Sequence, residues 1–277
     1  MITNEVVNRA IDYIFQHINE SISVDEIACH CNFSRYYFSR LFKMQTGESI
    51  CQFIRRAKME QSAFRLKVDR KKSITDICGN YGYSSSNYST AFKQHHKLSP
   101  IEYRRTISQR PLKNPIHGGF IDRLESFTEC SKKITVEALG DYPVIYERHK
   151  GNYGELSVHW GAFLEKYKDY ITEQTLFLER TYDDPNITDV DDCLYDICMT
   201  APKGCMLENT SLINGGRFAV YHFTGHIRQI YVSYQSIFNV WLPQSGFEID
   251  DRYGFDIYRK VDCDSMHMEV DFCIPIK

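Results

Sequence analysis

Residues that could contact a nucleic acid are concentrated in two short stretches of the N-terminal half. Each stretch predicts a helix with polar side chains on one side and aromatic side chains on the other. The polar, outward set comprises Arg35, Tyr36, Tyr37, Ser39, Arg40 and Lys43 in the first stretch, and Ser86, Asn87, Thr90 and Lys93 in the second. Side chains of these types hydrogen-bond to base edges and pair with phosphates in the major groove of DNA. A solvated helix face has a similar composition, so the surrounding elements must decide between the two interpretations.

Both stretches belong to a sequence unit of about 50 residues that occurs twice. The residue pairs that a gap-free shift of 50 brings together include Ser23 and Ser73, Ile27 and Ile77, Ser34 and Ser84, and Phe42 and Phe92. Repeats of this size indicate a duplicated structural unit. A duplicated pair of polar helix faces favours DNA over a solvated surface.

Each copy of the unit predicts two helices joined by a tight turn, the helix-turn-helix pattern. In the first copy Ser23–Glu26 forms a capping box that opens a helix over residues 24–31. Asn32 tolerates the left-handed geometry of the turn. Ser34 is the predicted cap of the next helix, and Gly47 ends that helix.

A long helix is predicted between the two copies, over residues 49–67. Ile50, Phe53, Ala57 and Leu66 lie there at near-helical spacing. A helix of that length spans roughly 28 Å at 1.5 Å per residue. It could hold two recognition helices about 34 Å apart, which is one turn of the duplex.

The charge of the chain is divided unevenly. The 277 residues contain 33 basic and 36 acidic side chains, a formal net charge of −3. Residues 1–110 hold 17 basic and 10 acidic side chains, a net charge of +7, whereas the remaining residues have a net charge of −10. Such an asymmetry indicates one half that faces nucleic acid. Two prolines and two glycines in residues 108–119 predict the domain boundary.

Several classes of protein are excluded. The first residues lack the basic and apolar regions of a secretory signal, and no stretch has the roughly 20 apolar residues that span a membrane. The ten cysteines are scattered, which favours reduced thiols in the cytoplasm. They lack the paired spacing of a zinc site, so we expect no metal and no cofactor.

The acidic half predicts an α+β fold. Strand-like alternation at residues 134–149, 217–223 and 267–276 is interrupted by helical patterns at 154–170 and 228–243. The order β-α-β-β occurs twice, which predicts helices packed on one face of an antiparallel sheet. The expected fold class is therefore multidomain: an all-α domain with two helix-turn-helix units joined by a long helix, followed by an α+β domain.

Two carboxylates in the last predicted strand are candidates for binding a ligand. Glu269 and Asp271 share one face of this strand with Cys273. Carboxylates beside aromatic side chains would attract a hydrophobic cation through charge pairing and cation–π contact. The alternation alone also fits a strand whose polar face is solvated, and from the pattern that interpretation is slightly favoured.

The N-terminal half resembles the AraC/XylS class of bacterial transcription regulators over about residues 4–106. The resemblance is carried by IACHCNFSRYYFSRLFKMQTGESICQFIRR and ICGNYGYSSSNYSTAFKQHHKLSPIEYRR. It implies double-stranded DNA as a partner, and base contacts from Tyr36, Ser39 and Arg40 in the first recognition helix and from Ser86, Asn87 and Thr90 in the second. Thr90 stands where an Arg is common, and Lys97 replaces the usual Gly. The resemblance thus implies that specificity depends mainly on Arg40 and its neighbours.

The C-terminal half resembles the GyrI-like effector-binding domain of multidrug-responsive regulators over about residues 130–277. EVDFCIPI, together with RFAVYHFTGHI and WLPQSGFEI, carries the resemblance. It implies a pocket between the two repeats and an acidic residue on the final strand that meets cationic ligands. Aligned on the IPI ending, that residue is Asp271, with Glu269 on the same face. The candidates for the pocket walls are Trp160, Tyr221 and Trp241.

The predicted function is a transcription regulator that binds DNA through residues 1–108, continues through a linker at 109–126, and binds a small amphipathic or cationic effector through residues 127–277. RNA polymerase is a further expected partner, and no membrane contact is expected. We expect no enzyme, although a hydrolase in which Asp271 or Glu269 acts with Tyr221 is one alternative. A second alternative is an acidic module that binds proteins.

Overall fold

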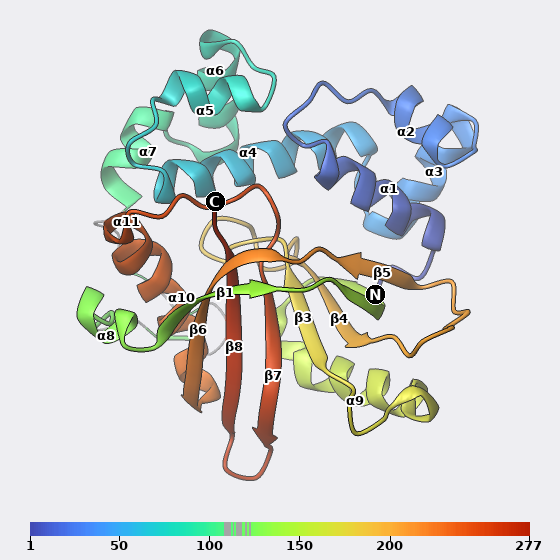
Figure 1. Cartoon of the computed structure of the whole chain (residues 1–277). Coiled ribbons are helices and arrows are strands. Elements are labelled where there is room, and N and C mark those ends of the chain that lie inside the picture. The colour runs from blue at the N-terminus through green and yellow to red at the C-terminus, as the bar shows by residue number, and fades with distance from the viewer. Residues whose placement is uncertain (108–111, 113, 115–117, 120, 122) are drawn as a thin grey trace. The chain divides into compact units, whose positions relative to one another are not determined.

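The computed structural model describes residues 1–107, 112, 114, 118, 119, 121 and 123–277. The chain forms two compact units, Met1–Arg110 and Pro111–Lys277 (Figure 1). Much of the predicted linker at 109–126 and of its Pro/Gly segment at 108–119 lies outside the described residues, so the predicted domain bounds stay a prediction. No helix in the described part of the chain is long and apolar enough to cross a membrane.

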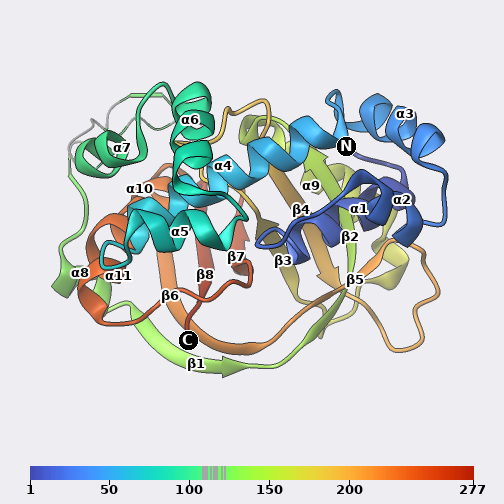
Figure 2. The same ribbon diagram turned by 90° about the horizontal axis from the view of Figure 1, so that it is seen from above.

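The N-terminal unit is helical, as predicted. Its helices are α1 (Glu5–Gln16), α2 (Val24–His30), α3 (Arg35–Thr46), α4 (Ile50–Val68), α5 (Ile74–Asn80), α6 (Ser85–His96) and α7 (Pro100–Thr106). The duplication is visible in the helix caps, because Ser23 and Ser73 both form capping boxes, and so do Ser49 and Ser99. Figure 2 shows α3 and α6 near the two ends of α4, the long helix that joins the helix-turn-helix units.

The C-terminal unit contains an eight-stranded antiparallel sheet and three α-helices of at least five residues in its described part. The strands are β1 (Ile134–Leu139), β2 (Tyr142–Lys150), β3 (Phe177–Thr181), β4 (Leu194–Thr200), β5 (Thr210–Ile213), β6 (Gly216–His226), β7 (Phe255–Asp262) and β8 (His267–Pro275). The helices are α8 (Phe127–Ser131), α9 (Leu156–Lys166) and α10 (Ile230–Ser236), and a π-helical turn, Ile237–Trp241, joins α10 to the short helix α11 (Leu242–Ser245).

The two predicted β-α-β-β repeats are confirmed as β2-α9-β3-β4 and β6-α10-β7-β8. The strand order is β1-β6-β8-β7-β3-β4-β2-β5, which reads the same from either edge when the repeats are exchanged. Each repeat also has a leading strand that pairs with the other repeat, β1 with β6 and β5 with β2. The repeats therefore meet at the centre of the sheet, where β3 pairs with β7.

The two faces of the sheet have different neighbours. On one face, which we call the helix face, Phe163 of α9 packs with Tyr195 and Ile197 of β4, and Tyr234 of α10 stacks on Phe272 of β8 at a ring distance of 4.4 Å. The other face, which we call the opposite face, carries an apolar cluster to which strands of both repeats contribute. Each strand residue therefore points either to the helix face or to the opposite face, and the two alternate along a strand.

Candidate DNA-recognition helices and acidic site

Helix α3 presents most of its predicted contact residues to solvent. Arg35, Tyr36, Tyr37, Arg40 and Lys43 are exposed and Ser39 is half-buried, whereas Phe38 and Phe42 are fully buried. The amphipathic pattern thus separates the face that packs from the face that is available to a partner.

Local contacts already organise part of this exposed face. The Arg40 guanidinium lies 5.8 Å from the centre of the Tyr36 ring, and Tyr37 stacks on Phe33 with ring centres 5.3 Å apart. Arg35 forms an ion pair of 3.0 Å with Asp25 of α2. Arg40 is therefore held by an aromatic ring rather than by a carboxylate.

The boundaries of α3 follow the sequence with one exception. Gly47 ends the helix in the left-handed region with φ of 80°, as predicted. Ser34 occupies the N-cap position, but its side chain makes no capping hydrogen bond. Ser34 therefore has the predicted position without a hydroxyl cap, whereas the equivalent Ser84 does accept a hydrogen bond from the Asn87 amide.

Helix α6 exposes a less charged surface. Ser86, Asn87, Thr90 and Lys93 are all exposed, so the predicted contact residues lie on one accessible face. The Thr90 hydroxyl donates to the carbonyl oxygen of Ser86 at 3.1 Å, which engages its proton within the helix. Lys93 is the only one of these four residues with a positively charged side chain.

Helix α4 ties the two helix-turn-helix units together through a buried lysine. The Lys58 Nζ donates to the carbonyl oxygens of Glu20, at 2.5 Å, and Tyr81, at 3.0 Å. Glu20 lies in the turn between α1 and α2, and Tyr81 ends α5. Burial lowers the pKa of Lys58. One side chain of α4 thus contacts the backbone of both helix-turn-helix units.

An acidic cluster lies at the centre of the helix face of the C-terminal unit. Glu179 of β3 and Asp256 of β7 are directly opposite each other in the strand pairing, and both side chains are buried, at 3% and 5% exposure. Directly opposed residues of antiparallel strands have Cβ atoms about 4.5–5.5 Å apart. Two carboxyl groups are therefore held side by side without contact with bulk water.

Each of the two carboxyl groups is paired with a tyrosine. The Tyr258 hydroxyl donates to Glu179 Oε2 at 2.7 Å, and the Tyr234 hydroxyl donates to Asp256 Oδ1. Burial raises the pKa of Glu179 to about 7, although the Tyr258 hydroxyl and the Trp160 indole oppose the rise. Burial, and then the nearby Glu179 charge, raise the pKa of Asp256 well above its usual value. Perturbed carboxyl groups of this kind are concentrated at functional sites.

Aromatic side chains of both helices lie beside these carboxyl groups. Trp160 of α9 lies edge-on to Tyr258 at a ring distance of 5.3 Å, and Tyr234 comes from α10. Trp160, Tyr234 and Tyr258 are half-buried, so the carboxyl groups lie below aromatic rings that solvent can reach. We refer to these five residues, Trp160, Glu179, Tyr234, Asp256 and Tyr258, as the acidic site.

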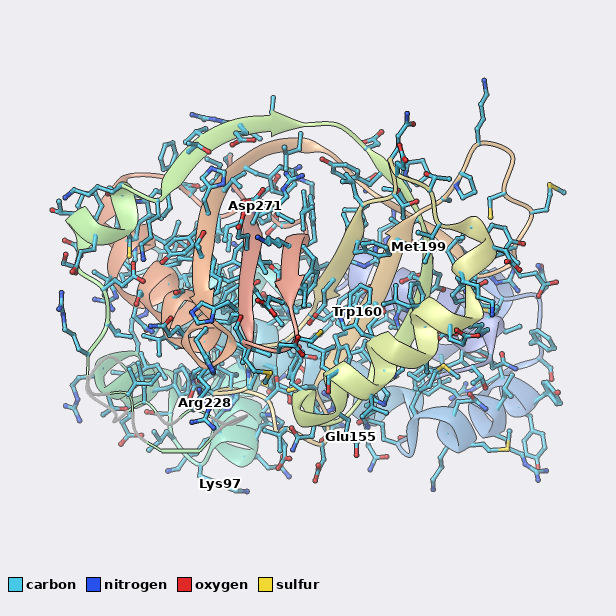
Figure 3. All side chains as sticks on the ribbon, turned by 90° about the horizontal axis from the view of Figure 1, so that it is seen from below. Lys97, Glu155, Trp160, Met199, Arg228 and Asp271 are labelled. Carbon is cyan, nitrogen blue, oxygen red and sulfur yellow. The ribbon has the colours of Figure 1, made fainter. Side chains whose placement is uncertain are left out.

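The structure does not bring the five predicted ligand residues together. Asp271 alternates with Phe272, which faces α10, so Asp271 lies on the opposite face. There it is 2.7 Å from His222 Nδ1 and accepts a hydrogen bond of 2.7 Å from Arg259 Nε. Glu269 is exposed on the same face. Figure 3 shows the labelled Asp271 of β8 well apart from the labelled Trp160 of α9.

The three predicted wall residues have separate locations as well. Only Trp160 belongs to the acidic site. The Tyr221 hydroxyl donates to Glu125 Oε1 at 2.7 Å and accepts from Lys133 Nζ at 3.0 Å, and its pKa is raised to about 12, chiefly by burial. Trp241 is 4% exposed and stacks on Phe247.

Sequence reasoning missed Glu179, Asp256 and Tyr234 as site residues. A signal for them is present, because Asp256 stands between Phe255 and Ile257, and Glu179 follows Phe177 and Leu178 in a strand of the same kind. An acidic residue within an apolar strand is buried only where it has partners. That rule would have marked both positions.

Comparison with known proteins places both units. Residues 132–277 match the family model of the GyrI-like small molecule binding domain, which is more than half of the chain. The chain belongs to the GyrI-like family. Residues 27–106 match a helix-turn-helix domain model, and this region is of the AraC type. The chain thus combines an AraC-type helix-turn-helix domain with a domain of the GyrI-like small molecule binding family.

Similar regulators cover the smaller part of the chain. The regulatory protein PocR of Salmonella typhimurium is 32% identical over 104 residues, which are 37% of this chain and 34% of PocR. The multiple antibiotic resistance protein MarA of Escherichia coli is 29% identical over 104 residues, 37% of this chain and 81% of MarA. The chain therefore spans about a third of PocR. The DNA-binding domain of AdpA in complex with a target DNA is similar with a TM-score of 0.36, at 23% identity, over 39% of this chain and 96% of that domain.

Proposed function

We propose that this GyrI-like regulator reads a specific DNA sequence with α3, anchors α6 mainly on phosphates, and changes its DNA affinity when a lipophilic cation binds the acidic site. The recognition helix α3 supports the first part, because Arg40 is exposed and free of a carboxylate within hydrogen-bond distance among the described contacts. An arginine with this freedom can bind the two acceptors of guanine. Tyr36 and Ser39 lie beside it on the same helix. The proposal also includes RNA polymerase as a partner and a cytoplasmic location.

On α6, the side chains proposed to reach bases are Ser86, Asn87 and Thr90, and Lys93 is proposed to pair with a phosphate. Because the Thr90 hydroxyl already donates within the helix, we expect this helix to discriminate less between sequences than α3. Selection of DNA fragments by the full chain from a random library tests this directly. The expected result is a site with one strongly and one weakly specified segment about one helical turn apart. Equal information in both segments would contradict the proposed difference.

The acidic site is the single observation that carries the effector proposal. Two buried carboxyl groups attract positive charge, and the accessible rings of Trp160, Tyr234 and Tyr258 offer cation–π contact. Flat aromatic cations combine both features. The 1-methyl-4-phenylpyridinium ion is a suitable probe because its charge does not depend on pH.

Matched variants distinguish the acidic site from the predicted site on β8. Glu179→Gln and Asp256→Asn remove the two carboxyl charges of the acidic site, and Glu269→Gln and Asp271→Asn make the same exchanges on the opposite face. Calorimetric titration of each full-length variant with 1-methyl-4-phenylpyridinium gives its affinity. We expect Glu179→Gln to weaken binding at least tenfold and Glu269→Gln to leave it within twofold. The reverse order would move the effector site to the opposite face.

Helix α10 offers a path from the acidic site to the segment that leads toward the DNA-binding unit. Tyr234 contacts Asp256, and Ser233 and Ser236 of the same helix both contact Glu125. The Ser236 Oγ accepts from the backbone amide of Glu125 at 2.9 Å. A ligand that displaces Tyr234 would therefore move the helix that holds this residue. Such coupling has to be reciprocal, since DNA must change ligand affinity by the same factor.

A hydrolase is a second candidate function, because Glu179 has a pKa near neutrality and lies next to the Tyr258 hydroxyl. A base with this pKa could take a proton from a water molecule that attacks an activated ester, while the alkoxide or phenolate leaves and is protonated by solvent. Hydrolysis of 4-nitrophenyl acetate by the full chain tests this function. A rate that rises with a midpoint near pH 7 and is lost in Glu179→Gln supports it. Equal rates for the unchanged chain and the variant exclude it for this substrate.

A further inference from the structure

Among the residues that the structure describes, no cationic side chain lies between the two carboxyl groups of the acidic site. Glu179 and Asp256 are opposite each other across the central strand pair, and they accept hydrogen bonds from the hydroxyl groups of Tyr258 and Tyr234. The buried Asp196 on the opposite face makes an instructive contrast, because it binds Arg148 and Arg180 and its pKa falls to about 2. The acidic site also contains buried carboxyl groups, but their hydrogen bonds come from tyrosine hydroxyls rather than from arginines.

Six titratable groups that interact with the two carboxyl groups are neutral at pH 7, whereas Arg148 and Arg180 on the opposite face are paired with Asp196. On the helix face the neutral groups are the hydroxyl groups of Tyr153, Tyr195, Tyr234 and Tyr258, and across the sheet they are the thiols of Cys198 and Cys273. Burial raises the pKa of every one of these six groups. None of them supplies a positive charge. The electrostatic balance of the site therefore depends on protons and on the ligand.

Two carboxylates that are buried at this separation repel each other strongly, so one of them binds a proton. We propose that Glu179 and Asp256 hold a shared proton when the site is empty, which a monocation leaves in place and a dication displaces, so that pH decides whether the site prefers singly or doubly charged aromatic cations. This inference rests on the proposed effector function. It adds the charge of the preferred ligand and a proton that leaves when a dication binds.

The exchange predicts different behaviour for two cations of similar shape. At pH 7 the pair with one proton carries one negative charge, which a monocation neutralises with little proton release. A dication requires both carboxylates, so it displaces the remaining proton. Each proton released makes the affinity rise about tenfold per pH unit, because binding and deprotonation are linked.

Methyl viologen and 1-methyl-4-phenylpyridinium form the matched pair of probes, since both are flat biaryl cations with permanent charge. Calorimetric titration of the full chain at pH 7 in phosphate and in Tris, two buffers with different ionisation enthalpies, gives the number of protons released. We expect about one more proton for methyl viologen than for the monocation. Equal release for both cations overturns the exchange and leaves the proposed effector class intact. Absence of binding by both cations overturns the exchange and the effector class together.

Asp256→Asn separates the shared proton from a general effect of pH. This variant keeps Glu179 and a polar group of the same shape, so we expect it to bind the monocation and to lose the additional proton released by methyl viologen. Asp271→Asn is the matched control on the opposite face and should keep that release. If Asp256→Asn releases protons like the unchanged chain, the second carboxyl is not part of the exchange.

A measurement without ligand tests the shared proton itself. The infrared difference spectrum between the unchanged chain and Asp256→Asn at pH 7 should contain the C=O stretch of a protonated carboxyl group. Its absence would overturn the proposal even if Asp256→Asn proved too unstable for titration with ligand. A thermal unfolding curve of each variant shows whether the fold is retained.

Discussion

The stability of the C-terminal unit should fall as pH rises, because Glu179 has to ionise in a buried position. Its pKa rises from 4.5 to about 7, and burial is the largest cause. The folded state therefore binds more protons than the unfolded state between these pH values. Under this condition the free energy of unfolding falls as pH rises through the window, and the full loss is present above pH 7.

The magnitude follows from the same pKa values. Each pKa unit corresponds to about 1.4 kcal/mol, so the rise from 4.5 to about 7 predicts a loss of about 3 kcal/mol between pH 4 and pH 8. Glu179→Gln removes this loss because the amide does not titrate. Asp256, whose pKa is also raised, changes the stability in the same direction.

Urea unfolding followed by tryptophan fluorescence measures this effect on the full chain. Both tryptophans, Trp160 and Trp241, lie in the C-terminal unit, so their emission reports on that unit alone. We expect the unchanged chain to lose about 2.5 kcal/mol more than Glu179→Gln between pH 5 and pH 8. Glu269→Gln, an exposed exchange of the same type, should behave like the unchanged chain. Parallel pH profiles for the unchanged chain and Glu179→Gln would refute a buried carboxyl with a raised pKa.

Three further predictions concern other parts of the molecule. Arg40→Ala should cost roughly 1–3 kcal/mol of binding free energy on the selected DNA and reduce discrimination between sequences, whereas Lys43→Ala should weaken binding to all sequences alike. Fluorescence anisotropy at several salt concentrations measures both affinities. Equal losses of affinity for both variants would contradict this prediction. Lys97→Gly should stabilise the N-terminal unit by about 1 kcal/mol. Lys97 has a φ of 62°, a left-handed conformation that glycine adopts at lower cost. A lower melting temperature of the variant, measured by circular dichroism, would contradict this prediction. Tyr221→Phe should destabilise the C-terminal unit by about 1–3 kcal/mol, because the Tyr221 hydroxyl contacts Glu125 and Lys133. The variant should bind 1-methyl-4-phenylpyridinium as tightly as the unchanged chain, which calorimetric titration measures.

The helical unit could be predicted almost completely, because its signals are local. The capping boxes at Ser23 and Ser49, and the left-handed Gly47, determine where helices begin and end without reference to distant residues. The exception at Ser34 is also local. That residue has the extended backbone of a cap, and only the orientation of its hydroxyl differs from the expectation.

The sheet could be predicted only in part, because strand pairing depends on distant residues. Alternation correctly indicated β1, β2, β6 and β8, and the order of the elements indicated the two repeats. It contains no information on the exchange of β1 and β5 between the repeats, which pairs Ile134 with Tyr221 and Tyr142 with Ile213. These contacts join segments that are far apart in the chain.

The location of the acidic site shows the same limitation more sharply. Alternation correctly predicts that Glu269, Asp271 and Cys273 share a face of β8. It does not predict which face the helices cover, and a period of two makes the two faces equivalent in sequence. The helices pack on the side of Phe272, so the carboxyl groups that meet Trp160 come from β3 and β7 instead.

The central claim is that a cation in the acidic site changes the affinity of the chain for DNA. The most direct test measures the Kd of the full chain for its selected DNA with and without saturating 1-methyl-4-phenylpyridinium, in the unchanged chain and in Glu179→Gln. The account predicts that the cation changes the Kd of the unchanged chain severalfold and leaves the Kd of Glu179→Gln unaltered at the same concentration. A cation effect of equal size in both proteins would contradict it.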